Sequence, residues 1–164
     1  MQMRNQVEWV LHCCSLLAAL PEGGRLSTKA LADFHGVPKE YLSKALQSLS
    51  QAGLVEGSLG PSGGYRLAKP ASEITFLDIV EAVEGKGRNF ACTEIRRNNP
   101  CLQGHDPKGP CQVARIMWQA DAAWRRELAA VKLSELTVTL ERELPADLQE
   151  RATTWVAARL GGSV

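Results

Sequence analysis

Apolar residues recur at helical spacing over most of the chain, and this pattern predicts a mainly helical protein. A first helix is expected over residues 4–20, which are rich in apolar side chains and are followed by a proline and a glycine pair. A second helix is expected to begin after Ser27, a good N-cap residue. A third is expected over residues 38–52, with Pro38 at its first position. Gly36 supplies the turn between the second helix and the third.

The third predicted helix has two faces of different chemistry. Its apolar stripe consists of Leu42, Ala45, Leu46 and Leu49. Its polar stripe consists of Ser43, Lys44, Gln47, Ser48 and Gln51. Short polar and basic side chains are the types that hydrogen-bond base edges and phosphates in the major groove of DNA. Two helices joined by a glycine turn therefore predict a helix-turn-helix, although other small helical hairpins share this pattern.

A glycine-rich hairpin is expected directly after these helices. Residues 54–59 and 65–67 read as short strands on either side of a Gly-Pro-Ser-Gly-Gly turn. Glycine lets a backbone approach a phosphate closely, and Arg66 can pair with a phosphate or enter a minor groove. A plain hairpin is the alternative, but after a helix-turn-helix this hairpin predicts the wing of a winged helix. The residues expected to contact DNA are Tyr41, Ser43, Lys44, Gln47, Ser48, Ser62, Gly63, Gly64 and Arg66.

The second half of the chain is expected to contain one long helix. A fourth helix over residues 75–84, capped by Thr75, comes first, and residues 86–110 then read as a long loop. Over residues 111–131, apolar side chains recur at steps of three and four. This stripe is wider than a small winged domain can cover, which favours a dimer interface over packing within one chain. Short helices are expected near residues 133–140 and 146–160.

These elements predict a mainly α fold with a small β-hairpin wing: a winged helix-turn-helix plus a long dimerisation helix. The expected divisions are a DNA-binding domain over residues 1–85, a cysteine-bearing cluster-binding loop over residues 86–110, and the dimerisation helix with C-terminal helices over residues 111–164. A palindromic duplex would suit such a homodimer.

Charge and composition refine this picture only locally. The net charge is +1, but residues 25–69 carry six basic and three acidic side chains, whereas residues 73–84 carry four acids and no base. This distribution fits either a localised phosphate-binding face or a solvated surface. No stretch approaches the roughly 18 apolar residues of a membrane helix, and the N-terminus has no signal-peptide pattern. A cytoplasmic, reducing environment is therefore expected, where clustered cysteines are more often metal ligands or redox centres than disulfides.

Two sets of side chains could ligate a metal. Glu8 and His12 interrupt an apolar helix that is otherwise built to be buried, and residues four apart on a helix have Cβ atoms about 6 Å apart. The long loop supplies Cys92, Cys101 and Cys111, separated by eight and nine residues. This spacing is unlike the close pairs of a zinc site, and thiolates are the usual ligands of iron–sulfur clusters.

The positions of the other thiols refine this interpretation. Cys111 is expected to begin a helix after Pro110, where the helix dipole favours a thiolate. Cys13 and Cys14 continue the apolar run of the first helix and are expected to be inert, buried thiols.

The chain resembles, over nearly its full length, a family of winged-helix transcriptional regulators that respond to iron–sulfur clusters, the IscR and NsrR type. The residues that carry the resemblance are the first helix, the Tyr-Leu-Ser-Lys segment from Tyr41, the Gly-Gly-Tyr-Arg-Leu motif from Gly63, residues 74–83, and the cysteine loop before a long helix. The likeness is closer to redox-sensing members typified by RsrR. Its carriers are residues 7–14, the Cys-Thr-Glu-Ile-Arg segment from Cys92, and the region around Cys111.

The closer resemblance implies a dimer with two 2Fe–2S clusters at the subunit interface. Glu8 and His12 of one subunit and Cys92 and Cys111 of the other would be the ligands, and Cys101 has no clear counterpart in this arrangement. Imidazole in place of thiolate raises a cluster's reduction potential, so this ligand set suits redox sensing. We expect the oxidised cluster to favour tight operator binding and its reduction or loss to weaken that binding.

Other functions stay open at this point. In an NsrR-like arrangement, three loop cysteines including Cys101 would bind a 4Fe–4S cluster, and the protein would sense nitric oxide or iron–sulfur status. A cluster-free regulator could instead sense oxidants or electrophiles through its thiols, or the chain could be a zinc-binding interaction module. An enzyme is not expected, because the sequence shows no nucleophile–base set, phosphate loop or cofactor fingerprint.

Overall fold

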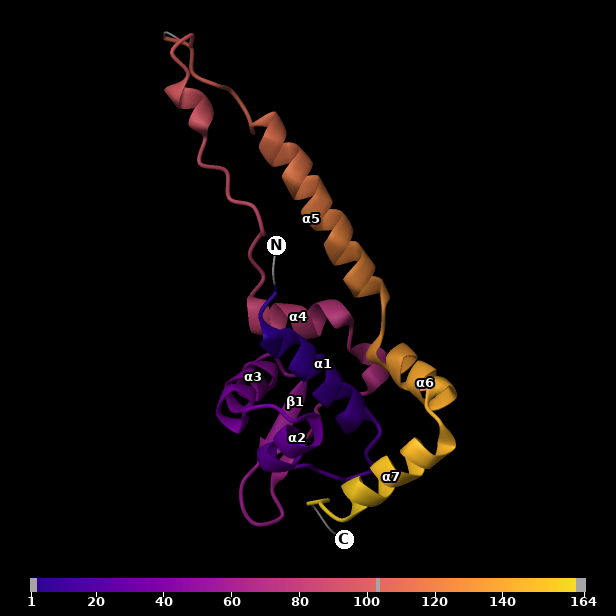
Figure 1. Ribbon diagram of the computed structural model, residues 1–164. Coiled ribbons are helices and arrows are strands. Elements are labelled where there is room, and N and C mark those ends of the chain that lie inside the picture. The colour runs from indigo at the N-terminus through magenta and orange to yellow at the C-terminus, as the bar shows by residue number, and fades with distance from the viewer. Residues whose placement is uncertain (1–2, 103, 162–164) are drawn as a thin grey trace.

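The computed structural model describes residues 3–102 and 104–161, and helices dominate it (Figure 1). The elements run in the order α1 Asn5–Ala18, α2 Thr28–His35, α3 Lys39–Gln51, β1 Val55–Ser58, β2 Gly64–Leu67, the 3-10 turn η1 Ala71–Glu73, α4 Phe76–Glu84, the 3-10 turn η2 Ile95–Asn98, α5 Gln112–Ala130, α6 Leu133–Glu143 and α7 Ala146–Ala157. A mainly helical fold with a small antiparallel hairpin is therefore confirmed.

The core forms where α1 packs against α3, α4 and α6. The expected apolar stripe of α3 is buried: Leu42, Leu46 and Leu49 are fully buried, and Ala45 is 2% exposed. Val10, Cys13 and Cys14 of α1 are also fully buried. Burial of this apolar surface is the main favourable contribution to folding.

Helix starts follow the capping residues that the sequence predicted. The Ser27 side chain accepts a hydrogen bond of 3.0 Å from the Ala30 N–H at the start of α2. Thr75 and Asp78 form a reciprocal capping box at the start of α4. Pro38 is the N-cap of α3 and not its first residue, a one-residue shift from the prediction. Helix ends commonly shift by this much because terminal backbone groups are only half within the hydrogen-bonded ladder.

The wing is a two-stranded hairpin in which Val55 pairs with Leu67 and Ser58 with Gly64. It is joined to a further extended segment, because Leu26 forms a bridge with Tyr65 of β2. The neighbouring Arg25 forms a bridge with Gly161, close to the C-terminus. The sequence pattern predicted the hairpin but gave no indication of these two additions.

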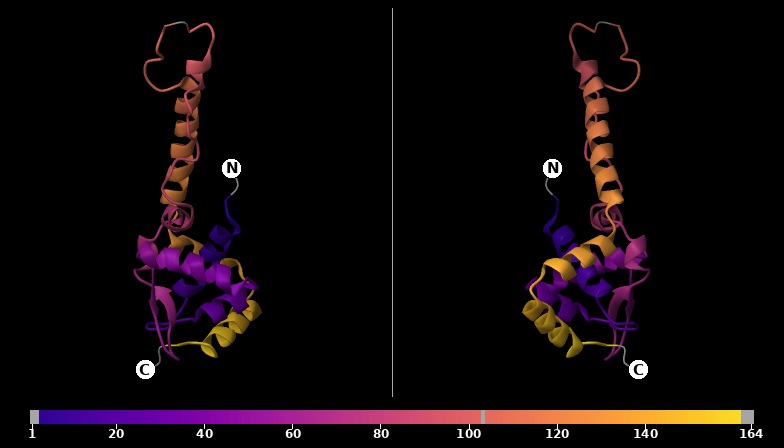
Figure 2. Two further views of the ribbon diagram at one scale, coloured as in Figure 1. Left: turned by 90° about the vertical axis from the view of Figure 1, so that its left-hand side faces the viewer. Right: turned by 90° about the vertical axis from the view of Figure 1, so that its right-hand side faces the viewer.

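The segments that carry η2 and α5 extend away from the other elements, as Figures 1 and 2 show. Only the C-terminal part of α5 joins the core: Trp124 and Leu128 pack against it, and Arg125 forms ion pairs with Glu81 and Asp121. Nearer its start, Val113 and Ile116 are 60% and 65% exposed. The apolar stripe of α5 is therefore largely uncovered within one chain.

Two expectations need correction. The first helix is less buried than its composition suggested, because Glu8 and His12 both lie on its exposed side. The loop over residues 86–110 is not without regular structure, since residues 95–98 form η2. No helix in the described ranges combines the length and apolarity that crossing a membrane requires.

Candidate nucleic-acid interface and metal ligands

The outward face of α3 carries the side chains that the sequence assigned to DNA contacts. Tyr41 is 58% exposed, and Lys44 and Gln47 are exposed. Ser43 and Ser48 are half-buried, and the Ser48 hydroxyl donates a hydrogen bond of 3.3 Å to the Lys44 carbonyl. Lys44 and Gln47 are therefore accessible to a ligand, whereas the Ser48 hydroxyl already has a partner within the helix.

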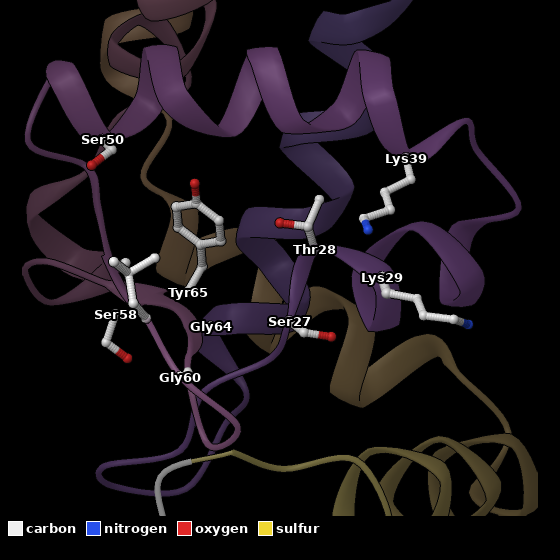
Figure 3. Close-up of a pocket in the computed structure, with 12 residues that line it drawn as sticks. Ser27, Thr28, Lys29, Lys39, Ser50, Ser58, Gly60, Gly64 and Tyr65 are labelled. Atoms are coloured by element: carbon white, nitrogen blue, oxygen red, sulfur yellow. The ribbon is translucent and has the colours of Figure 1, made fainter.

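An open hollow of about 530 Å³ separates α2 and α3 from the wing. Figure 3 shows Thr28, Lys29 and Lys39 on its helical side, with the Tyr65 ring standing between the wing and α3. The residues that line the hollow include Lys29 and Lys39 and several side chains with hydroxyl groups. Such a surface suits a phosphate backbone.

Sequence reasoning did not assign Lys29, Lys39 and Thr28 to this face. Lys29 and Lys39 are among the six basic residues of segment 25–69, and the excess of basic over acidic residues there is the feature of the sequence that could have indicated this face. Lys29 also forms an ion pair of 2.5 Å with Asp33, one helical turn further along α2.

The wing is held in place by ion pairs and by close backbone packing. Glu56 pairs with both Arg66 and Arg25, and Arg66 is the main cause of the lowered pKa of the Glu56 carboxyl. A Cβ on Gly63 would lie 2.4 Å from the Ser58 carbonyl oxygen, and a Cβ on Gly64 would lie 2.6 Å from Leu26. The turn therefore requires glycine at position 63, and the close approach of Leu26 requires it at position 64, independently of any DNA contact. Ser62 is exposed beside them.

Glu8 and His12 lie together on the exposed side of α1. They border an open, mainly apolar hollow of about 400 Å³, whose other walls include Leu11, Phe76 and Leu136. A carboxylate and an imidazole one helical turn apart can ligate the same metal ion.

A second histidine, His35, lies next to this pair. The rings of His12 and His35 have their centroids 5.8 Å apart, and the His35 Nε2 atom is buried without a hydrogen-bond partner among the described residues. Burial lowers the pKa of His35, and the nearby His12 adds to this. The sequence gave no signal for His35, because only tertiary packing brings α2 against this part of α1.

Cys92 and Cys111 both act electrostatically on the Arg96 guanidinium. Arg96 pairs with Glu94 and donates a hydrogen bond of 2.8 Å to the Gly109 carbonyl. Its pKa is raised chiefly by Glu94, with contributions from both Cys111 and Cys92. The folded loop thus brings two thiols that are far apart in sequence into the field of one positive charge.

The Cys111 thiol is at the N-cap of α5. Backbone N–H groups of Ala114 and Val113 lower its pKa, and the Arg96 charge acts in the same direction. This matches the expectation that the start of the long helix favours a thiolate. Glu94, between the cysteines, has φ 55°, in the left-handed region that non-glycine residues rarely adopt.

Cys101 is exposed on the same loop, where its N–H donates a hydrogen bond of 2.9 Å to the Asn99 side chain. Within residues 3–102 and 104–161 of one chain, no three His, Cys, Asp or Glu side chains gather as a metal site. Glu8 and His12 belong to α1, while η2 and its neighbouring cysteines lie on the extended segment (Figure 1). The candidate ligands therefore form two separate pairs within one chain, Glu8 with His12 and Cys92 with Cys111.

Thiol reactivity provides a direct test of these environments. Burial raises the pKa of Cys13 to about 12 and raises that of Cys14 further, whereas the pKa of Cys111 is lowered. We therefore expect iodoacetamide to alkylate Cys111 of chelator-treated protein well before Cys13 or Cys14 at neutral pH. Peptide mass spectrometry over a time course measures the order. Equal rates for Cys111 and Cys13 would contradict these environments; denatured protein is the control.

Residues 3–139 match the model of the Rrf2 family, which is described as an iron-dependent transcriptional regulator. The chain belongs to the Rrf2 family. It is 38% identical over 165 residues to YwgB of Bacillus subtilis (strain 168), and the match spans 100% of both chains. It is 35% identical to YffB of Lactococcus lactis, over 83% of this chain and 86% of that one. Both relatives are named as HTH-type transcriptional regulators.

Solved structures agree on the fold of this Rrf2 protein. CymR, the global cysteine regulator of B. subtilis, superposes with a TM-score of 0.65 at 22% identity, covering 85% of this chain and 98% of CymR. IscR of T. potens gives the same TM-score and identity, covering 88% of this chain and 93% of IscR. Rrf2 regulators are DNA-binding proteins and not enzymes, so the expected winged-helix fold and the regulatory class are both confirmed.

Proposed function

We propose that this Rrf2 protein is a homodimeric transcriptional regulator whose binding to a palindromic operator is switched by an iron–sulfur cluster, with 2Fe–2S favoured. Glu8 and His12 of one protomer and Cys92 and Cys111 of its partner are the proposed ligands. The observation that carries the proposal is that Cys92 and Cys111 lie on either side of η2 in the extended segment and both act on the Arg96 charge, while Glu8 and His12 lie exposed on a different element.

The donor set fits an iron–sulfur cluster better than a simple divalent ion. Two thiols, an imidazole and a carboxylate make four ligands of mixed softness, and the lowered pKa of Cys111 favours the thiolate form that ligates iron. The Arg96 guanidinium offsets part of the negative charge that thiolates bring to the loop.

The surfaces around the two pairs of proposed ligands also support the proposal that the pairs come together across a dimer interface. Ile95 is 71% exposed on the cysteine loop, and an apolar hollow borders Glu8 and His12 on α1. The exposed apolar stripe of α5, which carries Val113, Ile116 and Met117, provides a surface that a second copy would bury. Docking of two copies along α5 would remove these apolar groups from water and stabilise the dimer.

A cluster held this way supplies a change of charge on reduction. Glu8 and His12 would fix α1 of one protomer, while Cys92 and Cys111 fix the start of α5 of the other. Both elements are connected to a winged domain. A change in how the ligands hold α1 against the partner's α5 would therefore alter the tilt between the two α3 helices. A dimer must place these helices about 34 Å apart to read two half-sites, so a small rotation is enough to weaken binding.

Spectra and DNA binding of anaerobically purified protein test the proposal. We expect broad visible absorption and a 2Fe–2S Mössbauer signature, both lost in His12→Ala. A duplex selected by the protein from a random library should bind about tenfold or more tightly to the oxidised than to the reduced or stripped form, within the usual range of allosteric coupling. Equal affinity in all three states would show that no such switch exists. Loss of the signal in Cys101→Ala but not in His12→Ala would instead support the 4Fe–4S arrangement.

A cluster-free thiol sensor is the second candidate. The lowered pKa of Cys111, with Cys92 acting on the same Arg96, also suits reaction with an oxidant or electrophile. The fold resembles that of Staphylococcus aureus CymR, solved in an oxidised form, with a TM-score of 0.61 and 25% identity. A colourless, iron-free protein that loses DNA binding after mild oxidation would favour this candidate.

A further inference from the structure

The chain after α7 extends the sheet of the wing. Arg25 and Gly161 exchange both of their backbone hydrogen bonds, at 2.9 and 2.8 Å. The next residue, Leu26, exchanges both of its bonds with Tyr65 of β2, at 3.1 and 2.8 Å. The Arg25–Leu26 segment therefore lies between β2 on one side and the C-terminal segment on the other. Figures 1 and 2 show the chain returning from α7 towards the wing.

Gly161 lies directly against the turn of the wing. A Cβ at this position would lie 2.6 Å from the Ser62 carbonyl oxygen and 3.0 Å from that of Gly63. Both neighbours are backbone atoms, so a larger residue could be accommodated only if the wing or the C-terminal segment moved. The approach of these two backbones therefore depends on glycine at position 161.

The segment that delivers Gly161 is firmly anchored. Trp155 of α7 packs edge-on against Phe34 with ring centroids 5.0 Å apart, and Val156 is buried. Leu160 packs closely against Gly24. The Arg25 side chain also pairs with Glu56 of β1. The wing therefore contacts both the Arg25 side chain and the main chain at Gly161.

The chain between the end of α5 and the start of α6 is also held by backbone hydrogen bonds. Leu133 at the start of α6 donates a hydrogen bond of 2.9 Å to the Ile74 carbonyl, and the Phe76 N–H donates one of 3.0 Å to the Val131 carbonyl. A continuous run of packed elements therefore leads from the end of α5, through α6 and α7, to the wing.

We propose that the segment from α7 to Gly161 is a positioning element for DNA binding, which holds the wing where Ser62 and Arg66 contact DNA. The inference rests on the wing's contact with DNA but not on the iron–sulfur switch. It predicts that disrupting the packing of Gly161 against the wing weakens the contribution of the wing to DNA binding, while α3 continues to select the same base sequence.

The variant Gly161→Val tests this, and Gly87→Val is its matched control. Gly87 also has no positive φ, and a Cβ there meets nothing within 4 Å. With a duplex selected by the wild-type protein, we expect Gly161→Val to weaken binding about tenfold, equivalent to about 1.4 kcal/mol. The slope of log affinity against log salt should become shallower by about 0.9 for each phosphate that the wing no longer neutralises. Gly87→Val should match wild type in both.

Two further measurements test whether Gly161→Val weakens DNA binding by displacing the wing. Hydrogen exchange of the Leu26 and Tyr65 amides should accelerate in Gly161→Val while amides of α3 keep their protection. Arg66→Ala should weaken binding by itself, and adding Gly161→Val should then weaken it little further, because both changes remove the same interaction between the wing and DNA. A chain ending at Leu160 serves as a second variant if Gly161→Val folds poorly.

Unchanged affinity and salt slope in Gly161→Val would overturn the inference, as would additive effects in the double variant or an altered base preference. If Arg66→Ala binds as tightly as wild type, the wing does not contact DNA through Arg66 and the inference fails at its premise. None of these outcomes depends on iron, so they leave the test of the proposed cluster unaffected.

Discussion

Heterodimers of two complementary variants are expected to hold half of the wild-type iron, whereas each parent homodimer holds almost none. One protomer carries Glu8→Ala and His12→Ala, and the other carries Cys92→Ala and Cys111→Ala. If each site takes its ligands from both chains, the mixed dimer has one complete set and one empty set. Co-expression with two different affinity tags isolates the mixed dimer, and iron content per dimer with visible absorption measures the result.

The homodimers provide the internal controls for this experiment. Cys101→Ala in place of the double cysteine variant tests whether the third loop thiol belongs to the set. Sites built within one chain would give a different pattern, because neither protomer would then have a complete set and the mixed dimer would hold no iron. Wild-type iron content in the Glu8→Ala, His12→Ala homodimer would also refute the proposed ligands.

Leu46→Ala is expected to lower the free energy of unfolding by about 2–5 kcal/mol, the usual cost of truncating a buried leucine. The Leu46 side chain projects from α3 and is fully buried in the core. Its truncation therefore leaves a cavity that closely packed neighbours fill only in part. The loss is a large share of the about 5–15 kcal/mol by which domains are usually stable. Urea unfolding followed by circular dichroism measures it.

The next residue along α3 is the matched control. Gln47 is exposed, so Gln47→Ala should change the unfolding free energy by no more than about 0.5 kcal/mol. The same variant should change the base preference of the protein, because its amide is proposed to read base edges. A Gln47→Ala protein with wild-type preference would remove this side chain from base readout, and a stable Leu46→Ala protein would contradict the packing of α3.

Local signals in the sequence were sufficient for most of the elements. The four-residue and three-residue steps of Leu42, Leu46 and Leu49 predicted both α3 and its buried face, and these three residues are fully buried. Ser27 and Thr75 marked helix starts because their side chains satisfy N–H groups that a helix leaves free. The glycine-rich turn predicted the wing from equally local information, since only certain backbone angles allow such a turn.

The candidate site was only partly accessible from sequence. Glu8 and His12 were predicted as ligands from their spacing on one helix, and both lie on the exposed side of α1. The loop cysteines were predicted as a group, but their spacing could not show that Cys92 and Cys111 both act on the Arg96 charge. His35 was missed because nothing in its own neighbourhood indicates that it lies beside His12.

The sequence by itself determined the winged-helix class, the main helix faces and the residue types available for metal and DNA. These depend on periodicity and helix capping, which involve only residues a few positions apart in the sequence. Only the tertiary structure decided that α1 leaves Glu8 and His12 exposed, that the C-terminal segment joins the wing through Arg25, and that two thiols distant in sequence act on the charge of one guanidinium. The physical reason is that long-range contacts depend on how whole elements pack, and no short stretch of sequence specifies that packing.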